Sequence, residues 1–123
     1  MFKNLRFVYI TTQDREEARR IGRSIIENRL ATCINIIDDM ESIYWWEGEI
    51  QEGKEAILIA KTPYHNINSL TRLVRELHSY DCPSIFTLTI TEQEGNEEYL
   101  MWLLKEARKP ATSVQPDDSD EED

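Results

Sequence analysis

The pattern of apolar and polar positions along the chain predicts four strands and three helices. Runs rich in branched and aromatic residues predict strands at residues 5–11, 31–46, 49–62 and 84–91. Apolar residues at helical spacing predict helices that follow Asp14, begin near Ile67 and follow Asn96. The resulting order is β-α-β-β-α-β and then a last helix. This order is typical of an α+β, ferredoxin-like sandwich with an antiparallel sheet, two helices on one face and an extra C-terminal helix.

Local signals define the first helix and the hairpin between the second and third strands. Asp14 and Glu17 form a capping-box pattern at the start of the first helix. Asp38-Asp39 interrupts an apolar run and predicts a bulge in the second strand. Glu47-Gly48 predicts the turn that follows, and Gly53 predicts a second irregularity in the returning strand.

The central strands are apolar at both even and odd positions. Cys33 and Ile37 alternate with Ile34 and Ile36, whereas a sheet with one face in water would alternate apolar and polar residues. The run Tyr44-Trp45-Trp46 extends this pattern, because neighbouring side chains on a strand point to opposite faces. Either a second copy of the chain covers the second face or that face lines a pocket. A monomer with a partly exposed Trp is the alternative, but self-association is the simplest interpretation.

Charge separates the chain into a body and a tail. The 123 residues carry a net charge of −10, and a cluster of acids lies at the C-terminal end. We expect a single domain over residues 1–109 and a disordered acidic tail over residues 110–123, because the tail has too few apolar residues to fold. No basic stripe with interleaved aromatics occurs, so nucleic acid is not expected as a partner.

The apolar runs and the cysteines predict a cytoplasmic protein. No run approaches the length of a membrane span, and the segment from Met1 to Asn4 lacks a signal-peptide pattern, so no membrane partner is expected. Cys33 and Cys82 lie far apart, each in an apolar strand-like run. They predict small buried thiols in a reducing compartment rather than a disulfide.

Few residues suggest chemistry. His78 ends the second predicted helix, where it could interact with the helix dipole, or contribute to a metal site with Tyr80, Asp81 and Cys82. No zinc motif, P-loop, dinucleotide fingerprint or nucleophile elbow occurs. The residues by themselves therefore specify no enzyme.

Several segments together resemble the CutA divalent-cation tolerance family. The resemblance rests on residues 8–12 with 16–18, 29–37, 42–50 with 61–62, and 74–83 with 95–102, and the hairpin 42–50 is its most specific part. It implies a ferredoxin-like subunit in a tight homotrimer, with strands pairing across subunits and an architecture similar to trimeric nitrogen-regulatory signal proteins. It also implies a link to divalent-metal tolerance, especially of copper, and no catalytic reaction.

The resemblance also implies a copper site that this chain retains only in part. In some family members the ligands are a Cys late in the first strand and two adjacent His residues at the end of the second helix. The matching positions here are Ile10, Leu77 and His78, and only His78 can bind a metal. Any binding of copper or another divalent cation is therefore expected to be weak or differently built, and no cofactor is required. Cys33 matches a family Cys, but its strand context favours a packed thiol.

The leading interpretation is a homotrimeric, non-enzymatic, cytoplasmic protein that binds metal ions or a small ligand in clefts between subunits. The residues assigned to the cleft are Tyr44, Trp46, Lys61 and Tyr80, and the metal candidates are His78 and Cys33. One alternative is a trimeric scaffold or signalling protein that binds another protein. A further alternative is an enzyme that acts on a small acid through Lys61 and Glu47.

Overall fold

The computed structural model describes residues 2–107 and contains the predicted order of elements. The strands are β1 (Leu5–Thr12), β2 (Cys33–Trp46), β3 (Glu49–Pro63) and β4 (Ile85–Thr89). The helices are α1 (Arg15–Glu27), the short 3₁₀ helix Tyr64–Asn66, α2 (Ile67–Leu77) and α3 (Glu97–Ala107). The strands form one antiparallel sheet in the order β2-β3-β1-β4. The predicted α+β, ferredoxin-like sandwich is confirmed; the predicted tail, residues 110–123, lies outside the described residues.

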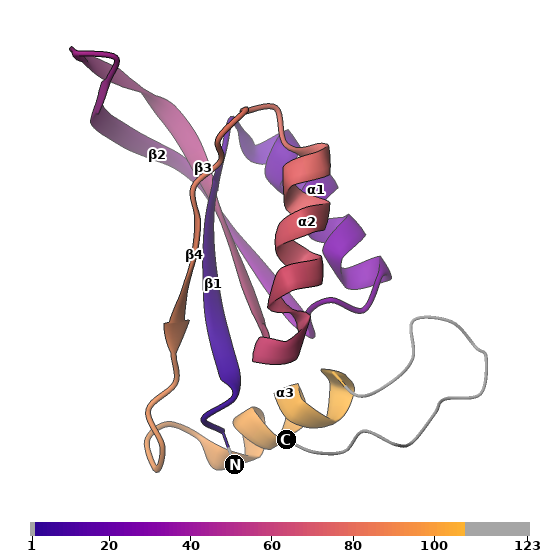
Figure 1. Ribbon diagram of the computed structural model, residues 1–123. Helices are drawn as coiled ribbons and strands as arrows, with labels where there is room; N and C mark the ends of the chain where they lie inside the picture. The colour runs from indigo at the N-terminus through magenta and orange to yellow at the C-terminus, as the bar shows by residue number, and fades with distance from the viewer. Residues whose placement is uncertain (1, 108–123) are drawn as a thin grey trace.

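Two layers make up the body of the molecule. Helices α1 and α2 lie side by side on one face of the sheet, and α3 lies beyond one end of it (Figure 1). Side chains from β1 and β3 meet those helices in a core from which water is excluded. Its fully buried members include Val8, Ile10, Ile21, Ile25, Leu58, Leu70 and Val74.

Polar side chains at the helix ends and a glycine within α1 support this packing. Asp14 caps α1, since its Oδ1 accepts the Glu17 N–H at 2.9 Å. Asn96 caps α3 through a 3.0 Å bond from the Glu98 N–H. A Cβ at Gly22 would lie 3.0 Å from side-chain carbons of Ile34 and Leu58, so glycine lets α1 approach the sheet closely.

The β2–β3 hairpin extends past the ends of the helices (Figure 1). Its turn is Glu47-Gly48, with φ of 52° and 83°, which suits a tight two-residue loop. The predicted bulge is confirmed, because β2 contains one extra residue between Ile37 and Met40 relative to β3. The predicted irregularity at Gly53 is wrong, since Gly53 pairs with Ser42 in unbroken register.

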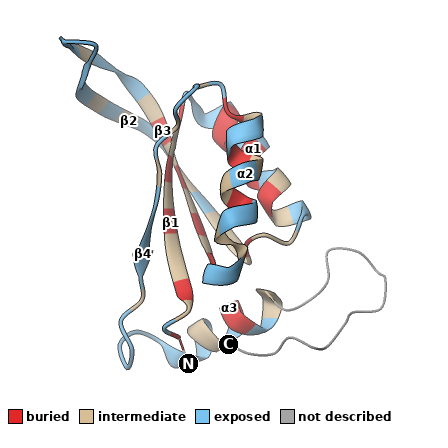
Figure 2. Cartoon of the chain, viewed as in Figure 1, coloured by how far each residue is buried: buried red, intermediate tan, exposed pale blue. Residues whose placement is uncertain are grey.

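The face of the sheet opposite the helices is open, as is most of the hairpin (Figure 2). We call this surface the open face; it carries exposed Ile37, Tyr44, Trp46, Phe86 and Leu88. On the opposite side of the hairpin, Ile43 and Trp45 are exposed as well, because the helices do not reach them. The prediction of strands that are apolar on both faces is therefore confirmed.

The cysteines and the helices bear on two further predictions. Cys33 and Cys82 are both free thiols, but Cys82 is exposed, so the prediction that it is buried is wrong. It lies in the irregular segment that joins α2 to β4, outside any strand. No helix within residues 2–107 is long and apolar enough to span a bilayer.

Candidate functional site

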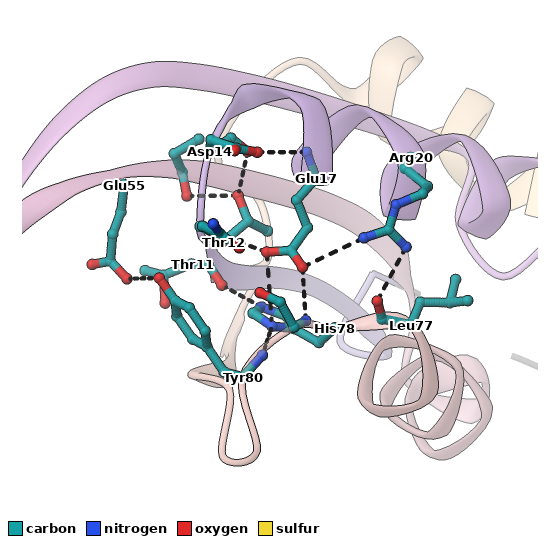
Figure 3. Close-up of polar contacts among 12 residues, drawn as sticks. Thr11, Thr12, Asp14, Glu17, Arg20, Glu55, Leu77, His78 and Tyr80 are labelled. Carbon is teal, nitrogen blue, oxygen red and sulfur yellow. Dashed lines mark hydrogen bonds and ion pairs between the residues drawn. The ribbon is translucent and has the colours of Figure 1, made fainter.

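The end of α2 carries a buried histidine whose two ring nitrogens are both occupied. His78 Nε2 lies 2.8 Å from the carbonyl oxygen of Thr11, and Nδ1 lies 3.0 Å from the backbone nitrogen of Tyr80 (Figure 3). A carbonyl can only accept a hydrogen bond and a backbone N–H can only donate one. The proton of the ring must therefore lie on Nε2, and the imidazole is neutral. His78 joins β1 to the segment after α2.

Glu17 places a carboxylate beside this histidine. Its side chain is buried; Oε1 accepts the Gln13 N–H at 2.8 Å, and Oε2 accepts the Ser79 N–H at 2.7 Å. Burial raises the pKa of Glu17, but the hydrogen bonds from Gln13 and Ser79 outweigh it, so the net pKa lies below its usual value. The ionised carboxylate thereby ties α1 to the segment after α2.

Arg20 extends the same network to the surface. Its guanidinium donates to the carbonyl of Leu77 at 3.1 Å and lies 3.5 Å from the Glu17 carboxylate (Figure 3). Half of this side chain is exposed, so it closes the buried carboxylate off from solvent rather than adding a strong ion pair.

Tyr80 and Glu55 form a second pair at this end of the sheet. The Tyr80 hydroxyl donates to Glu55 Oε2 at 2.7 Å, and its ring lies 4.7 Å from the His78 ring. Burial, this hydrogen bond and the negative charge of Glu55 raise the pKa of Tyr80, so its phenol stays neutral and remains a donor. Tyr44 pairs with Gln51 and lies on the same face of the hairpin as Glu55.

Lys61 and Cys33 lie at the other end of the sheet, next to α3. Lys61 Nζ lies 3.1 Å from the Tyr99 hydroxyl and 5.3 Å from the centre of its ring. Cys33 pairs with Lys61 across the β2–β3 ladder and packs against the small apolar cluster of Phe2, Leu5, Leu103 and Leu104. The thiol is thus a partly buried packing group in this chain.

The residues assigned to the cleft do not meet within one chain. Trp46 pairs with Glu49 near the hairpin turn, twelve positions along β3 from Lys61. That separation corresponds to about 40 Å of strand. The turn residue Glu47 is equally remote from Lys61, so the two residues of the enzyme alternative do not meet in one chain either.

The metal candidates also lie apart. Cys33 is at the α3 end of the sheet, whereas His78 contacts Thr11 at the far end of β1. Ile10 is fully buried in the core, and Leu77 packs against the same core. Among residues 2–107, no three His, Cys, Asp or Glu side chains converge as a metal site would require.

Sequence reasoning missed the roles of Glu17, Glu55 and Tyr99. The capping-box pattern explains only one role of Glu17, which lies four residues before the buried Ile21 on the same face of α1. An acid on the apolar face of a helix is a readable signal for a buried partner. Glu55 and Tyr99 offer no such signal, because their partners come from distant parts of the chain.

Comparison with known proteins identifies the family. A family model described as CutA1 divalent ion tolerance protein matches residues 6–106. The chain belongs to the CutA family. Within the family, the chain is 45% identical over 96 residues to the divalent-cation tolerance protein CutA of Thermus thermophilus, a match that covers 78% of this chain and 91% of that protein.

Plant members of the CutA family are similarly close. The chain is 41% identical over 102 residues to the chloroplastic protein CutA 1 of Oryza sativa, covering 83% of this chain and 56% of that protein. It therefore spans about half the length of this plant relative. The crystal structure of CutA1 from Oryza sativa superposes with a TM-score of 0.79 at 40% identity, covering 85% of this chain and 94% of that chain. The sequence comparison and the structure comparison thus both identify the CutA family.

Proposed function

We propose that this CutA family member is a homotrimer that binds a small ligand or a metal ion in clefts between subunits and catalyses no reaction. The observation that carries the proposal is the open face together with the hairpin. Trp45 is 71% exposed, Trp46 55% and Leu88 53% in the single chain. A monomer rarely exposes this much contiguous apolar surface, whereas an interface between copies would bury it. The number of copies follows from the family resemblance.

The separation of the assigned residues supports a cleft made from two copies. Lys61 and Trp46 are too far apart to contact one ligand within a chain, so neighbouring copies would have to supply one of them each. Tyr80 offers a neutral hydroxyl held by Glu55, and Lys61 offers an ammonium group held by Tyr99. Such a cleft would suit a small polar ligand that needs both hydrogen bonds and a positive charge.

For copper or another divalent cation, we propose weak binding. The CutA relatives of Thermus thermophilus and Pyrococcus horikoshii are named divalent-cation tolerance proteins. In this chain, a metal at His78 would have to displace the hydrogen bond to Thr11 or the one from Tyr80. Cys33 is engaged in packing, and Ile10 and Leu77 have no donor atoms.

We also propose a cytoplasmic location, which the two free thiols support. The relatives differ on this point. Those of Oryza sativa and Arabidopsis thaliana are named chloroplastic, and the Archaeoglobus fulgidus protein of known structure is named periplasmic. Fractionation of cells that express the natural chain tests the compartment directly.

Two measurements test the proposed function. Light scattering at micromolar concentration should give three times the chain mass of 14.5 kDa, and a monomer mass would refute the assembly. Calorimetry with copper and zinc, with a thermal-shift screen of metabolites, then tests the cleft, since a ligand of the folded state raises the melting temperature. A trimer that responds only to another protein would favour the alternative of a scaffold.

A further inference from the structure

A groove between α1 and β2 combines arginine side chains with an apolar floor. Its lining residues are Arg19, Arg23, Ile26, Glu27, Ile34 and Ile36. The three isoleucines are half-buried, and the charged side chains are exposed. Ile34 and Ile36 point toward the helices, so the groove lies on the opposite side of the sheet from the open face. The proposed trimer contact on the open face does not require this groove.

The arginines of the groove are available to an acidic ligand. Arg19 has no hydrogen-bond or ion-pair partner among residues 2–107. Arg23 lies 3.1 Å from Glu27, but the two side chains are 77% and 62% exposed. Exposed ion pairs of this kind stabilise a protein little, so an acidic ligand can exchange with Glu27. In a chain of net charge −10, this arginine pair attracts carboxylates.

The chain leaves the described structure next to this groove. Glu106, at the end of α3, lies 3.8 Å from Arg29, just past the end of α1. The Thr32 hydroxyl donates to the carbonyl of Leu103 at 2.9 Å, which holds α3 at the start of β2. The C-terminal end of α3 therefore lies where α1 ends and β2 begins, and Ile26 and Ile34 of the groove belong to these same ends of α1 and β2.

The segment that follows matches the groove in charge, polarity and reach. Residues 110–123 contain one branched aliphatic side chain, Val114, and six acids: Asp117, Asp118, Asp120, Glu121, Glu122 and Asp123. A flexible chain of about ten residues spans roughly 17 Å on average. The axial rise of α1 from Glu27 to Arg19 is about 12 Å. A chain of that length can therefore extend from the end of α3 along α1 to both arginines.

We propose that residues 110–123 dock in the groove between α1 and β2 of the same chain, with their carboxylates on Arg19 and Arg23 and Val114 over the isoleucines. The attraction is electrostatic and needs no single tail conformation. Linkage to the body gives the tail a high effective concentration, so weak pairs suffice.

A spin label in the tail of the full chain tests the proposal. Ser119→Cys is labelled in a background of Cys33→Ser and Cys82→Ser, and amide signals are recorded by NMR. In about 0.01 M salt, the signals of Ile26, Ile34 and Ile36 should lose intensity relative to the reduced, diamagnetic label. In about 1 M salt, where charges are screened beyond about 3 Å, that intensity should return.

Charge reversal supplies the matched control. Arg19→Glu with Arg23→Glu should abolish the loss of intensity. Arg72→Glu with Arg75→Glu makes the same change of charge in the exposed groove on α2 and should leave the loss in place. Full intensity at the α1–β2 groove in low salt would overturn the proposal. So would an equal effect of the two charge reversals, since the attraction would then be unspecific.

Discussion

The two faces of the sheet differ in what covers them, not in the kind of residue they carry. On the face toward α1 and α2, Val8, Ile10 and Leu58 have no exposed surface. On the open face, Phe86 stacks on Tyr9 at 5.1 Å between ring centres, yet it is 51% exposed. Apolar residues on a strand therefore predict that a face will be covered. They do not tell whether the chain or another molecule provides the cover.

The open face predicts the largest effect of a single substitution. In the proposed trimer Trp46→Ala removes a side chain buried between copies, and we expect a loss of about 3–5 kcal/mol in the free energy of unfolding. The loss should grow as the protein is diluted, because assembly contributes to it. Urea denaturation at two protein concentrations measures both. An unchanged stability would show that Trp46 stays in water.

A substitution on the face covered by α1 and α2 should lower the free energy of unfolding by an amount that does not depend on protein concentration. Leu58→Ala leaves a cavity in the core of each chain, and we expect a loss of about 2–5 kcal/mol. Leu88→Ala, a change of the same size on the open face, is the matched control. If Leu88 contacts only solvent, its substitution costs less than about 0.5 kcal/mol. A similar loss in both variants, concentration-dependent only for Leu88→Ala, would support the proposed interface.

The buried hydrogen bonds of Glu17 predict that the stability of the folded chain depends on pH. The pKa of Glu17 in the folded chain lies below its usual value of 4.5. Its stabilisation is therefore fully present above that value and is lost as the pH falls through the folded pKa. Glu17→Gln should be less stable near neutral pH and should lose less stability below about pH 4. Glu16→Gln, on the exposed side of the same helical turn, should keep the acid dependence of the parent chain.

Titration with copper should show whether His78 belongs to a hydrogen-bond network or to a metal site. Because both ring nitrogens of His78 are occupied, His78→Ala should change the copper affinity measured by calorimetry by less than about threefold, or roughly 0.6 kcal/mol. The same substitution should lower stability by about 1–3 kcal/mol, since Thr11 and Tyr80 lose buried partners. A stoichiometric, submicromolar copper site that disappears in this variant would contradict the assigned hydrogen bonds.

The tail should have the smallest effect. Deleting residues 110–123 removes no part of either sheet face, and we expect fold and assembly to persist. The change in stability should stay within about 0.5 kcal/mol, and any loss should vanish at high salt. Thermal unfolding of the two chains at low and high salt measures it. A clear drop in melting temperature at high salt would mean that the tail contributes to the core.

The fold could be predicted from the sequence because its signals are local. Asp14 and Asn96 mark the starts of helices, and Glu47-Gly48 marks the turn. The prediction of an irregularity at Gly53 is wrong because a glycine can also pair regularly within a strand, as Gly53 does with Ser42. No atom lies within 4 Å of a Cβ built at Gly53, so close packing does not require glycine there either. The β-α-β-β-α-β order of these elements then predicted the ferredoxin-like sandwich.

The candidate site could be predicted only in part. His78 and Tyr80 are neighbours in sequence, so their proximity was foreseeable. Their partners were not, since Thr11 lies 67 positions from His78 and Glu55 lies 25 from Tyr80. Only the folded sheet shows that His78 has no nitrogen left for a metal.

The bulge in β2 changes the phase of the strand. Before it, odd-numbered residues such as Ile37 face away from the helices; after it, Met40 takes that direction, and its sulfur lies 3.5 Å from the Tyr9 hydroxyl. By alternation, Tyr44 and Trp46 follow Met40. If the strand alternated regularly through Asp38 and Asp39 without a bulge, Ile43 and Trp45 would occupy that face instead. The bulge at Asp38-Asp39 therefore decides which aromatic pair lies on the open face, because it takes up one residue and shifts the alternation of all later side chains in β2 by one position.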